Sequence, residues 1–288
     1  MFNPDQEETV SNVWFITGAG RGIGAAIARS ALEAGHRVVA TGRKARDLEA
    51  TFAGHGESVL CLPLDVAREP QSVDAVARAV DRFGRIDVVV NNAGYGQLGL
   101  FEEVASTAID EQFQTNVFGL MHVTRAVLPH MRSQRSGHIF NLASIGGFMG
   151  FESSSIYCAT KFAVEGFSES LALEVARFGI HVTVVEPGFF RTDFLDATSV
   201  RYGDKRIVDY DDPQGAARVD YEAYNHRQPG DPAKLGRALV QMAAMAKPPL
   251  RFTAGSDALA YARQAFDRRQ VEIAEHAALS VSTDFAAG

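Results

Sequence analysis

The sequence predicts a doubly wound α/β fold, with one parallel sheet of about seven strands and helices on both faces. From Val13 onward, short runs rich in β-branched residues alternate with longer amphipathic stretches, which is typical of a parallel sheet covered by helices. A chain of 288 residues that is 46% hydrophobic and 22% charged has enough apolar material for one large domain. We therefore predict a single domain over residues 11–288, preceded by a flexible tail at residues 1–10.

Seven short apolar runs are the candidate strands. They are Val13–Thr17, Arg37–Thr41, Val59–Leu62, Ile86–Asn91, His138–Ala143, His181–Glu186 and Leu250–Thr253. Helices between them are marked by apolar residues at helical spacing, in one case Ile23, Ile27, Ala28 and Leu32, in another Val73, Val76, Val80 and Phe83. Gly35 and Gly84 follow these two helices, as C-terminal glycines often do, and a further long helix is predicted from Ser153 to about Phe178.

One segment, Phe189–Asp231, interrupts the rhythm of strands and helices. It is rich in charge, tyrosine and glycine, and its acids include Asp204, Asp209, Asp211 and Asp212. Because a long excursion inside a compact domain is commonly a lid or a binding loop, we predict that residues 189–231 form a lid-like excursion over a substrate site. A disordered insertion is the alternative.

Composition and charge exclude several classes of function. The net charge of -7 and the pI near 5.6 argue against nucleic acid as a partner and give no reason to expect an anionic membrane surface. The N-terminus shows no secretory signal, and no apolar run reaches the roughly 20 residues that a membrane span needs. Cys61 and Cys158 lack the spacing of metal ligands, so we expect a cytoplasmic protein with no metal and no disulfide framework.

A glycine-rich turn directly follows the first predicted strand and opens a helix. It reads Thr17-Gly18-Ala19-Gly20-Arg21-Gly22-Ile23-Gly24. Glycines at these positions permit a tight turn and a close approach of the backbone to a pyrophosphate, while the helix N-terminus offers N–H donors. The context of strand, turn and helix predicts a dinucleotide site.

The residues after the second predicted strand indicate which dinucleotide binds. An NAD site usually carries an acid there, for the ribose hydroxyls, whereas this sequence reads Ala40-Thr41-Gly42-Arg43-Lys44. A guanidinium holds a 2′-phosphate with paired charge-assisted hydrogen bonds, so we predict NADP(H), with Arg43 on the phosphate and Arg21 and Lys44 as helpers. A solvated basic cluster is the alternative explanation.

A tyrosine and a lysine four residues apart form the candidate catalytic pair. Tyr157 and Lys161 lie near the start of the long helix, and a spacing of four places them on the same helical face. A phenol with its ordinary pKa of about 10 is a poor proton donor or acceptor at neutral pH, but a nearby ammonium favours the phenolate. Ser144 directly follows the fifth predicted strand, at the edge where open α/β sheets bind ligands, so it is expected to reach the same pocket.

Together these motifs resemble the short-chain dehydrogenase/reductase family in its compact, non-extended form, which has a Rossmann-type fold. The similarity extends over about Val13–Thr192 and fades in the C-terminal third. The matching motifs are the glycine turn, Asp65-Val66, Asn91-Asn92-Ala93-Gly94, Asn116 within Gln114-Thr115-Asn116-Val117, Ser144, Tyr157, Lys161, and Pro187-Gly188 followed by Thr192.

The resemblance implies a role for each matching residue. The catalytic set would be Asn116, Ser144, Tyr157 and Lys161. Tyr157 would exchange a proton with the substrate oxygen, Ser144 would hydrogen-bond that oxygen, Lys161 would assist Tyr157 and hold the ribose, and Asn116 would kink its helix and hold a relay water. The cofactor-binding set would be Gly18, Arg21, Gly22, Ile23, Gly24, Arg43, Asp65, Val66, Asn91, Ala93, Gly94, Tyr157, Lys161, Pro187, Gly188 and Thr192.

Apolar residues near the predicted nicotinamide end point to a large aromatic substrate pocket. They are Phe148, Met149, Phe151, Phe189, Phe190 and Phe194, with Tyr95, Gln97 and Leu98 as a possible further wall. Arg191 is the one cation in these segments, which favours a bulky neutral carbonyl or alcohol as the substrate. Half of the rings packing against the core instead is the alternative.

We therefore expect an NADP(H)-dependent oxidoreductase that interconverts a carbonyl and an alcohol. Imine or enoyl reduction, epimerisation through a transient ketone, and a non-catalytic NADP(H) sensor are the alternatives. The helix after Tyr157 carries more apolar residues than one narrow stripe needs, including Val164 and Leu173, and members of the resembled family pair through this helix. A homodimer or homotetramer is expected on that basis, with a monomer as the alternative.

Overall fold

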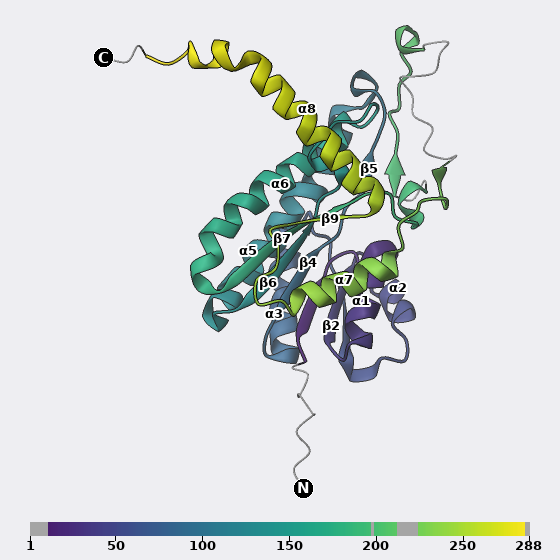
Figure 1. Cartoon of the computed structure of the whole chain (residues 1–288). Coiled ribbons are helices and arrows are strands. Elements are labelled where there is room, and N and C mark those ends of the chain that lie inside the picture. Colours follow the sequence, from purple (N-terminus) through teal and green to yellow (C-terminus); the bar gives the residue numbers. More distant parts are fainter. Residues whose placement is uncertain (1–10, 197–198, 212–223, 286–288) are drawn as a thin grey trace.

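The computed structural model describes residues 11–196, 199–211 and 224–285, and its central feature is a parallel sheet of seven strands (Figure 1). The strand order across the sheet is β3-β2-β1-β4-β6-β7-β9, and every pairing is parallel. Each strand overlaps one of the seven predicted runs, so the predicted sheet is confirmed. The strands are β1 (Val13–Ile16), β2 (Arg37–Gly42), β3 (Val59–Pro63), β4 (Val88–Asn91), β6 (Gly137–Leu142), β7 (Ile180–Pro187) and β9 (Arg251–Ala254).

The chain begins in the middle of the sheet. β1 pairs with β2 on one side and with β4 on the other, so that Phe15 lies between Val39 and Val89. After β3 the chain crosses back over β1 to reach β4, and the direction of winding reverses there. Such a reversal opens a crevice at the carboxyl ends of the two central strands, which is where sheets of this type bind ligands.

Both faces of the sheet are buried, which explains why its strands read as continuous apolar runs. In β1, Val13 and Phe15 pack into the core on one face, while Trp14 and Ile16 pack into the core on the other. All four side chains are fully buried.

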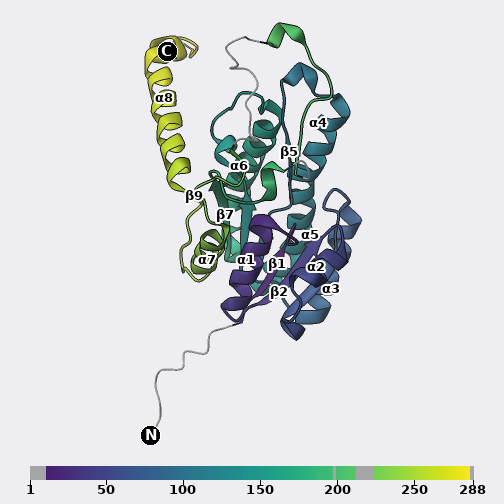
Figure 2. The same cartoon turned by 90° about the vertical axis from the view of Figure 1, so that its right-hand side faces the viewer.

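Helices cover both faces of the sheet, as predicted (Figures 1 and 2). One core receives Val76, Val123 and Leu171 from α3 (Glu69–Phe83), α5 (Gly119–Gln134) and α6 (Ser155–Val175). The opposite core receives Ile27, Leu48 and Leu235 from α1 (Gly22–Glu33), α2 (Ala45–Thr51) and α7 (Pro232–Ala243). The doubly wound architecture is thus confirmed.

Two predicted helix ends are confirmed by their glycines. Gly84 has φ of +78° directly after α3, and Gly35 has φ of +82° two residues after the end of α1. Glycine adopts these left-handed values without the steric cost that a Cβ adds. The predicted long helix appears as α6, and a 3₁₀ turn at Ala176–Phe178 extends it to the predicted end.

The excursion between β7 and α7 contains only short elements in the residues that the structure describes. Val200–Arg201 forms β8, which pairs with β5 (Gly96–Gln97) as a second, two-stranded sheet. The excursion returns to the body where Phe190 bridges Gly230. The predicted tail at residues 1–10, residues 197–198 and residues 212–223, which include Asp212, lie outside the described residues.

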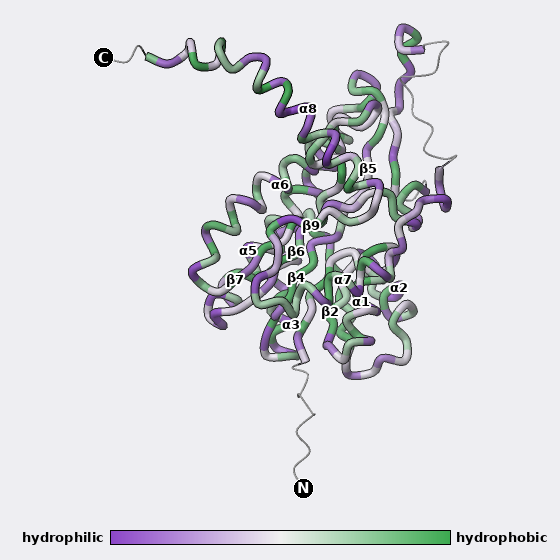
Figure 3. The backbone as a smooth tube through the Cα atoms, viewed as in Figure 1, coloured by the Kyte–Doolittle hydropathy of each residue, from purple (hydrophilic) through white to green (hydrophobic). Residues whose placement is uncertain are grey.

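A long C-terminal helix, α8 (Ser256–Val281), projects from the body of the molecule (Figures 1 and 2). Ala258 and Ala262 near its start are buried, and from Phe266 onward its described side chains are exposed. Apolar and polar residues alternate along its outer part (Figure 3). Sequence analysis assigned no element here. In the described part of the chain, no helix is long and apolar enough to cross a membrane.

His138 in β6 makes the stability of the fold depend on pH. Its ring stacks on Phe140 with centroids 3.9 Å apart, and its Nε2 lies 2.9 Å from Thr183 Oγ1. Burial lowers the pKa of His138 to about 3, and His181 adds to the decrease. Between pH about 6.5 and about 3 the unfolded chain therefore binds one more proton than the folded protein.

We expect His138→Gln to flatten the pH dependence of stability below pH 6.5. In the parent protein this residue lowers the free energy of unfolding by up to about 1.4 kcal/mol per pH unit as the pH falls. Urea unfolding at several pH values between 4 and 7 measures the slope, and His276→Gln on exposed α8 is the control. Equal slopes in the parent and His138→Gln would contradict the prediction.

Candidate active site

An open cavity of about 1210 Å³ lies at the carboxyl edge of the sheet. Its wall is formed by the segments that follow β1, β2, β3, β4, β6 and β7, together with the excursion. The cavity therefore occupies the crevice that the strand order creates. It is large enough for a dinucleotide and a small substrate side by side, since ligand pockets typically measure about 300–1,000 Å³.

The glycine turn between β1 and α1 forms one wall. Gly18 and Gly22 line the cavity with φ of +64° and +57°, values that glycine adopts without strain. A Cβ at Gly18 would lie 3.0 Å from the Cα of Ala93, and one at Gly24 would collide with the carbonyl oxygen of Gly18. At these two positions the turn packs too tightly for a side chain, and it brings the N-terminus of α1 to the cavity, where the helix offers N–H donors to an anion.

Thr17 and Asn92 tie this turn to the end of β4. Thr17 Oγ1 accepts hydrogen bonds from the backbone N–H groups of Asn92 and Ala93, both at 3.0 Å. The side-chain amide of Asn92 donates to the carbonyl oxygens of Thr17 and Gly18 at 2.9 and 3.1 Å. Neither residue is among the predicted site residues. The available signal was that both polar residues follow neighbouring strands at the carboxyl edge of the sheet.

Ser144, Tyr157 and Lys161 line the same cavity, so the structure brings three of the four predicted catalytic residues together. Ser144 follows β6, and its Oγ accepts a hydrogen bond from the Gly146 N–H at 3.2 Å. The half-buried Tyr157 ring packs 6.0 Å from the Phe194 ring, centroid to centroid. Lys161 Nζ lies 5.6 Å from the centre of the Tyr157 ring, because the two residues are one helical turn apart on α6.

Lys161 is a buried cation with an unusual titration. Only 8% of the residue is exposed, and Nζ donates a hydrogen bond to the Leu142 carbonyl oxygen at 2.7 Å. Burial lowers the pKa of Lys161 to about 8, although the nearby Glu165 opposes the change. An ammonium with a pKa near neutrality, next to a phenol in a cavity, is typical of a proton-transfer site.

Asn116 lies behind the wall of the cavity, in a π-helical turn over Gln114–Phe118 that joins α4 (Ser106–Phe113) to α5. Its side-chain amide donates to the Tyr95 carbonyl oxygen at 2.9 Å and to Thr160 Oγ1 at 3.3 Å, and its oxygen accepts from the Tyr95 N–H at 3.1 Å. The π-helical turn interrupts the regular α-helix at Asn116, the position at which the kink is predicted. In this arrangement the side chain braces Tyr95 and α6, and the relay water stays a prediction.

Most of the predicted cofactor-binding residues line the cavity. At the end of β2 these are Arg43 and Lys44, with Arg21 across from them in the glycine turn. The remaining lining residues from the predicted set are Gly18, Gly22, Ile23, Asp65, Val66, Ala93, Gly94, Tyr157, Lys161, Pro187, Gly188 and Thr192. Asp47, which sequence analysis did not consider, also lines the basic end.

Two predicted cofactor residues lie behind the lining. Gly24 faces the glycine turn and the Asn92 side chain, so its role is close packing. Asn91 is buried and bridges three elements, because its Nδ2 donates to Thr124 Oγ1 at 3.0 Å and to Asn141 Oδ1 at 2.8 Å. Both support the cavity from beneath.

Asp257, in the first turn of α8, holds the loop after β7. Its carboxylate accepts a hydrogen bond from the Phe189 N–H at 2.7 Å and packs against Gly188, where a Cβ would collide with it. Asp257 is not among the predicted site residues, because it is 68 positions from Phe189 in the sequence and outside the region of family resemblance.

The expected aromatic pocket forms in part. Phe151, Phe189, Phe190 and Phe194 line the cavity, together with Tyr95 and Leu98. Phe148 stacks on Phe266 of α8 with centroids 6.1 Å apart, and neither Phe148 nor Met149 is in the lining. Gln97 is likewise buried in β5.

Arg201 brings a further cation to this end of the cavity. It comes from β8, stacks 4.7 Å from the centre of the Tyr95 ring, and pairs with Glu111 at 2.6 Å. The expected cation, Arg191, instead donates to the Gln228 carbonyl oxygen at 3.2 Å and lies outside the lining. Because Arg201 is paired with an acid, the pocket gains little net positive charge from it.

Asp193, Asp196 and His226 in the excursion form a mixed group whose ligand atoms lie within 4.8 Å of one another. Asp196 Oδ1 already accepts a hydrogen bond from Asn225 Nδ2 at 2.5 Å and lies 3.5 Å from His226 Nε2. These side chains are exposed or half-exposed, and such groups are common without an ion. The absence of a metal therefore stays a prediction.

Comparisons with known proteins agree on one family. A family model described as short chain dehydrogenase matches residues 12–202. Oxidoreductase BOA17 of Botryotinia fuckeliana is 40% identical over 89% of this chain and 93% of its own length. The 3-ketodihydrosphingosine reductase of Bacteroides thetaiotaomicron is 38% identical over 83% and 86%.

Solved structures show the same relationship. A short-chain dehydrogenase from Streptomyces avermitilis superimposes with a TM-score of 0.87 at 38% identity, covering 96% of this chain and 100% of that one. Two further structures contain a nicotinamide cofactor. One is a short-chain dehydrogenase/reductase from Burkholderia phymatum in complex with NAD, with a TM-score of 0.74 at 25% identity, covering 84% of this chain and 88% of that one. The other is a serine dehydrogenase complexed with NADP+, with a TM-score of 0.72 at 27% identity, covering 83% of this chain and 93% of that one.

We expect Thr17→Val to destabilise the fold by about 1–3 kcal/mol, because it leaves the part-buried N–H groups of Asn92 and Ala93 without their acceptor. Thr17→Ser keeps the hydroxyl and should remain close to the parent protein. Urea unfolding compares the free energies of unfolding of the three proteins. If Thr17→Val and Thr17→Ser lower the free energy of unfolding by the same amount, the hydroxyl group does not hold the turn.

Proposed function

The chain belongs to the short-chain dehydrogenase family, and from this premise we propose that it transfers a hydride between NADP(H) and the carbonyl or alcohol carbon of a bulky, mostly apolar substrate. The observation that carries the proposal is the meeting of Ser144, Tyr157 and Lys161 in a cavity that also contains the glycine turn. The family supports the general activity, dehydrogenase or reductase, and the residues of this chain support the finer assignment.

The cavity suits a nicotinamide dinucleotide. Its glycine turn packs closely at Gly18 and Gly24 and brings the N-terminus of α1 to the wall, which suits a pyrophosphate. Arg43, Lys44 and Arg21 at the far end suit a further phosphate group. When bound, the cofactor supplies or accepts the hydride.

Each catalytic side chain has a role that its geometry supports. Ser144 Oγ accepts from the Gly146 N–H, so its own O–H is available to donate to the substrate oxygen and stabilise the developing negative charge. Tyr157 donates the proton to that oxygen during reduction and accepts it during oxidation. Lys161, buried beside the ring, favours the phenolate through its positive charge.

The aromatic part of the lining supports a bulky carbonyl substrate. Phe151, Phe189 and Phe194 supply apolar surface, and the pairing of Arg201 with Glu111 limits the attraction for an anion. A 38% identical relative is named as the reductase of a keto compound, which agrees with carbonyl reduction.

We also propose a homodimer or homotetramer in a reducing, cytoplasmic compartment. Val164 is buried within the chain, but Leu173 is 81% exposed and Phe162 is 40% exposed, so α6 retains apolar surface that a second copy would cover.

The free Cys61 and Cys158 agree with a reducing compartment, and burial raises the pKa of the Cys158 thiol, as expected for inert packing.

Tyr157→Phe tests the mechanism. We expect turnover to fall by about 10²–10⁴-fold, because the variant loses its proton donor, while the dissociation constant of NADPH stays close to the parent value. NADPH absorbance with a panel of bulky ketones and aldehydes measures turnover, and Tyr261→Phe on α8 is the control. Undiminished turnover in Tyr157→Phe would exclude this mechanism. If the parent protein binds NADPH tightly but reduces no compound of the panel, a non-catalytic sensor is favoured.

Arg43→Ala tests the cofactor preference. Charge-assisted hydrogen bonds contribute about 1.5–3 kcal/mol, so we expect the dissociation constant of NADPH to rise about 10-fold or more. The affinity for NADH should change little. Fluorescence titration measures both constants, with Arg46→Ala as the control because Arg46 lies outside the cavity lining. Equal weakening of NADPH and NADH would show that Arg43 does not contact the 2′-phosphate.

A further inference from the structure

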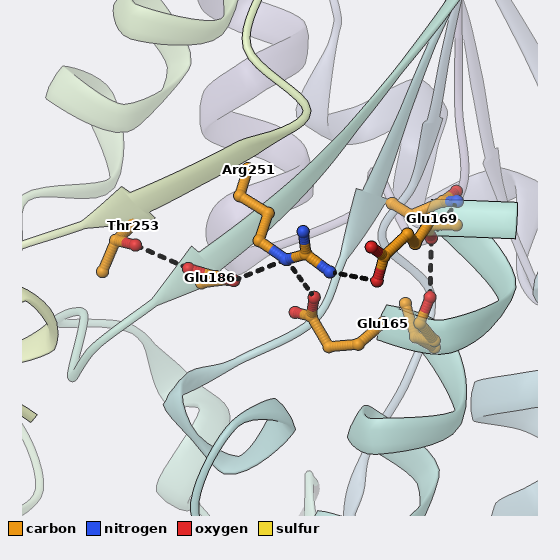
Figure 4. A network of polar contacts seen from close by, with 8 residues as sticks. Glu165, Glu169, Glu186, Arg251 and Thr253 are labelled. Atoms are coloured by element: carbon orange, nitrogen blue, oxygen red, sulfur yellow. Dashed lines mark hydrogen bonds and ion pairs between the residues drawn. The ribbon is translucent and has the colours of Figure 1, made fainter. Parts of the chain in front are cut away.

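Figure 4 shows a group of charged side chains from α6, β7 and β9 that form hydrogen bonds and ion pairs with one another. Glu165 is in α6, one turn after Lys161. Glu186 is near the end of β7 and directly precedes Pro187, the last residue of that strand. Only 8% of Glu165 and 3% of Glu186 is exposed. Because a buried carboxylate is costly unless it is paired, such a group needs a partner.

That partner is Arg251 of β9. Its Nε donates to Glu165 Oε2 at 3.2 Å and lies 3.8 Å from Glu186 Oε1, while Nη2 donates to the more exposed Glu169 at 2.7 Å. Thr253 Oγ1 completes the group by donating to Glu186 Oε2 at 2.5 Å. One guanidinium thus links the catalytic helix α6 to the strand that leads into the cofactor loop.

Glu165 is also next to the loop that carries Ser144. A Cβ at Gly147 would lie 3.1 Å from Glu165 Cγ and 3.2 Å from Oε1, and the Gly147 N–H donates to the Ser144 carbonyl oxygen at 2.8 Å. The carboxylate therefore packs against the end of the serine loop. Its Oε1 is buried and has no hydrogen-bond partner among the described residues.

The position of Glu165 couples its charge to that of Lys161. Burial, followed by the charge of Glu186, raises the pKa of Glu165 to about 7, and Arg251 acts in the opposite direction. Burial lowers the pKa of Lys161 to about 8, and the charge of Glu165 raises it. The charge of Glu165 therefore favours the ammonium form of Lys161.

We propose that Glu165, held by Arg251, is a positioning residue of the active site, whose carboxylate keeps Lys161 in its ammonium form and supports the loop that presents Ser144. The consequence for catalysis rests on the proposed function, because it requires Lys161 to act on Tyr157. The consequence for the charge of Lys161 does not, and it is measurable in the protein without cofactor.

The sign of the effect follows from the charges. Loss of the Glu165 charge removes an attraction for the ammonium, so the pKa of Lys161 falls below about 8. Carbonyl reduction needs the charged lysine, so its rate falls as the pH rises through this pKa. In Glu165→Gln that fall should begin about one pH unit lower.

Glu169→Gln is the matched control. Glu169 contacts the same guanidinium from the next turn of α6, but 56% of its side chain is exposed. This substitution removes one acid from the cluster and leaves Glu165 in place. We expect it to change neither the pKa of Lys161 nor the pH profile.

The experiment is an NMR titration of the cofactor-free protein labelled with ¹³C at the lysine Cε atoms. The chain has five lysines, and the resonance lost in Lys161→Met assigns Lys161. We expect a midpoint near pH 8 in the parent protein and in Glu169→Gln, and a midpoint lower by about one unit in Glu165→Gln. Equal midpoints in the parent and Glu165→Gln would overturn the proposal.

Arg251 supplies a second, independent test. Arg251→Met removes the cation that favours the Glu165 carboxylate, so the Lys161 midpoint should fall in the same direction, and Arg251→Lys should restore part of it. The double variant Glu165→Gln/Arg251→Met should match Glu165→Gln, because the guanidinium acts through this carboxylate. Additive shifts in the double variant would overturn that order of action.

The pH profile of ketone reduction separates this proposal from the proposed function. A lower midpoint in Glu165→Gln, in both the NMR titration and the profile of kcat/KM, supports both proposals. A shifted NMR midpoint with an unshifted rate profile overturns the catalytic role of Glu165. If no ketone is reduced by the parent protein, the proposed function fails, and a shifted NMR midpoint still supports the electrostatic role.

Discussion

The pairing of β1 with β2 on one side and β4 on the other is the constraint on which the site depends. Because the first strand is central, the connections that follow β1 and β4 leave toward opposite faces of the sheet and open a crevice between them. Thr17 and Asn92 fasten the two strand ends to each other with four hydrogen bonds. The glycine turn is held at the edge of that crevice, and every other segment of the cavity is arranged around it.

The chemistry of the site depends on burial of charge. Lys161 is almost fully buried on α6, and burial brings its pKa down toward neutrality. Behind it, Glu165 and Glu186 share the Arg251 guanidinium, so the cost of removing three charges from water is offset by their contacts. A group of this kind contributes little net stability, but it joins α6, β7 and β9 to one another.

The C-terminal third, where the family resemblance fades, supports the site from outside. Arg251 in β9 reaches the catalytic helix, and Asp257 in α8 holds the backbone of Phe189. One turn after Asp257 on α8, Tyr261 packs edge-on against Phe151, with ring centres 5.5 Å apart. Residues outside the shared motifs therefore hold segments that line the cavity.

The sequence by itself determined the sheet, its helices and the three residues that meet in the cavity, since these depend on local signals. Strand runs, helical spacing and a glycine turn after β1 are readable because each reflects the geometry of a short segment. Only the tertiary structure decided that Phe148 faces α8, that Asn91 braces strands behind the cavity, and that Arg201 replaces Arg191 at its wall. Contacts such as Glu165 with Arg251 join residues 86 positions apart. No local pattern specifies such a partner, because the packing of whole elements brings the two side chains together.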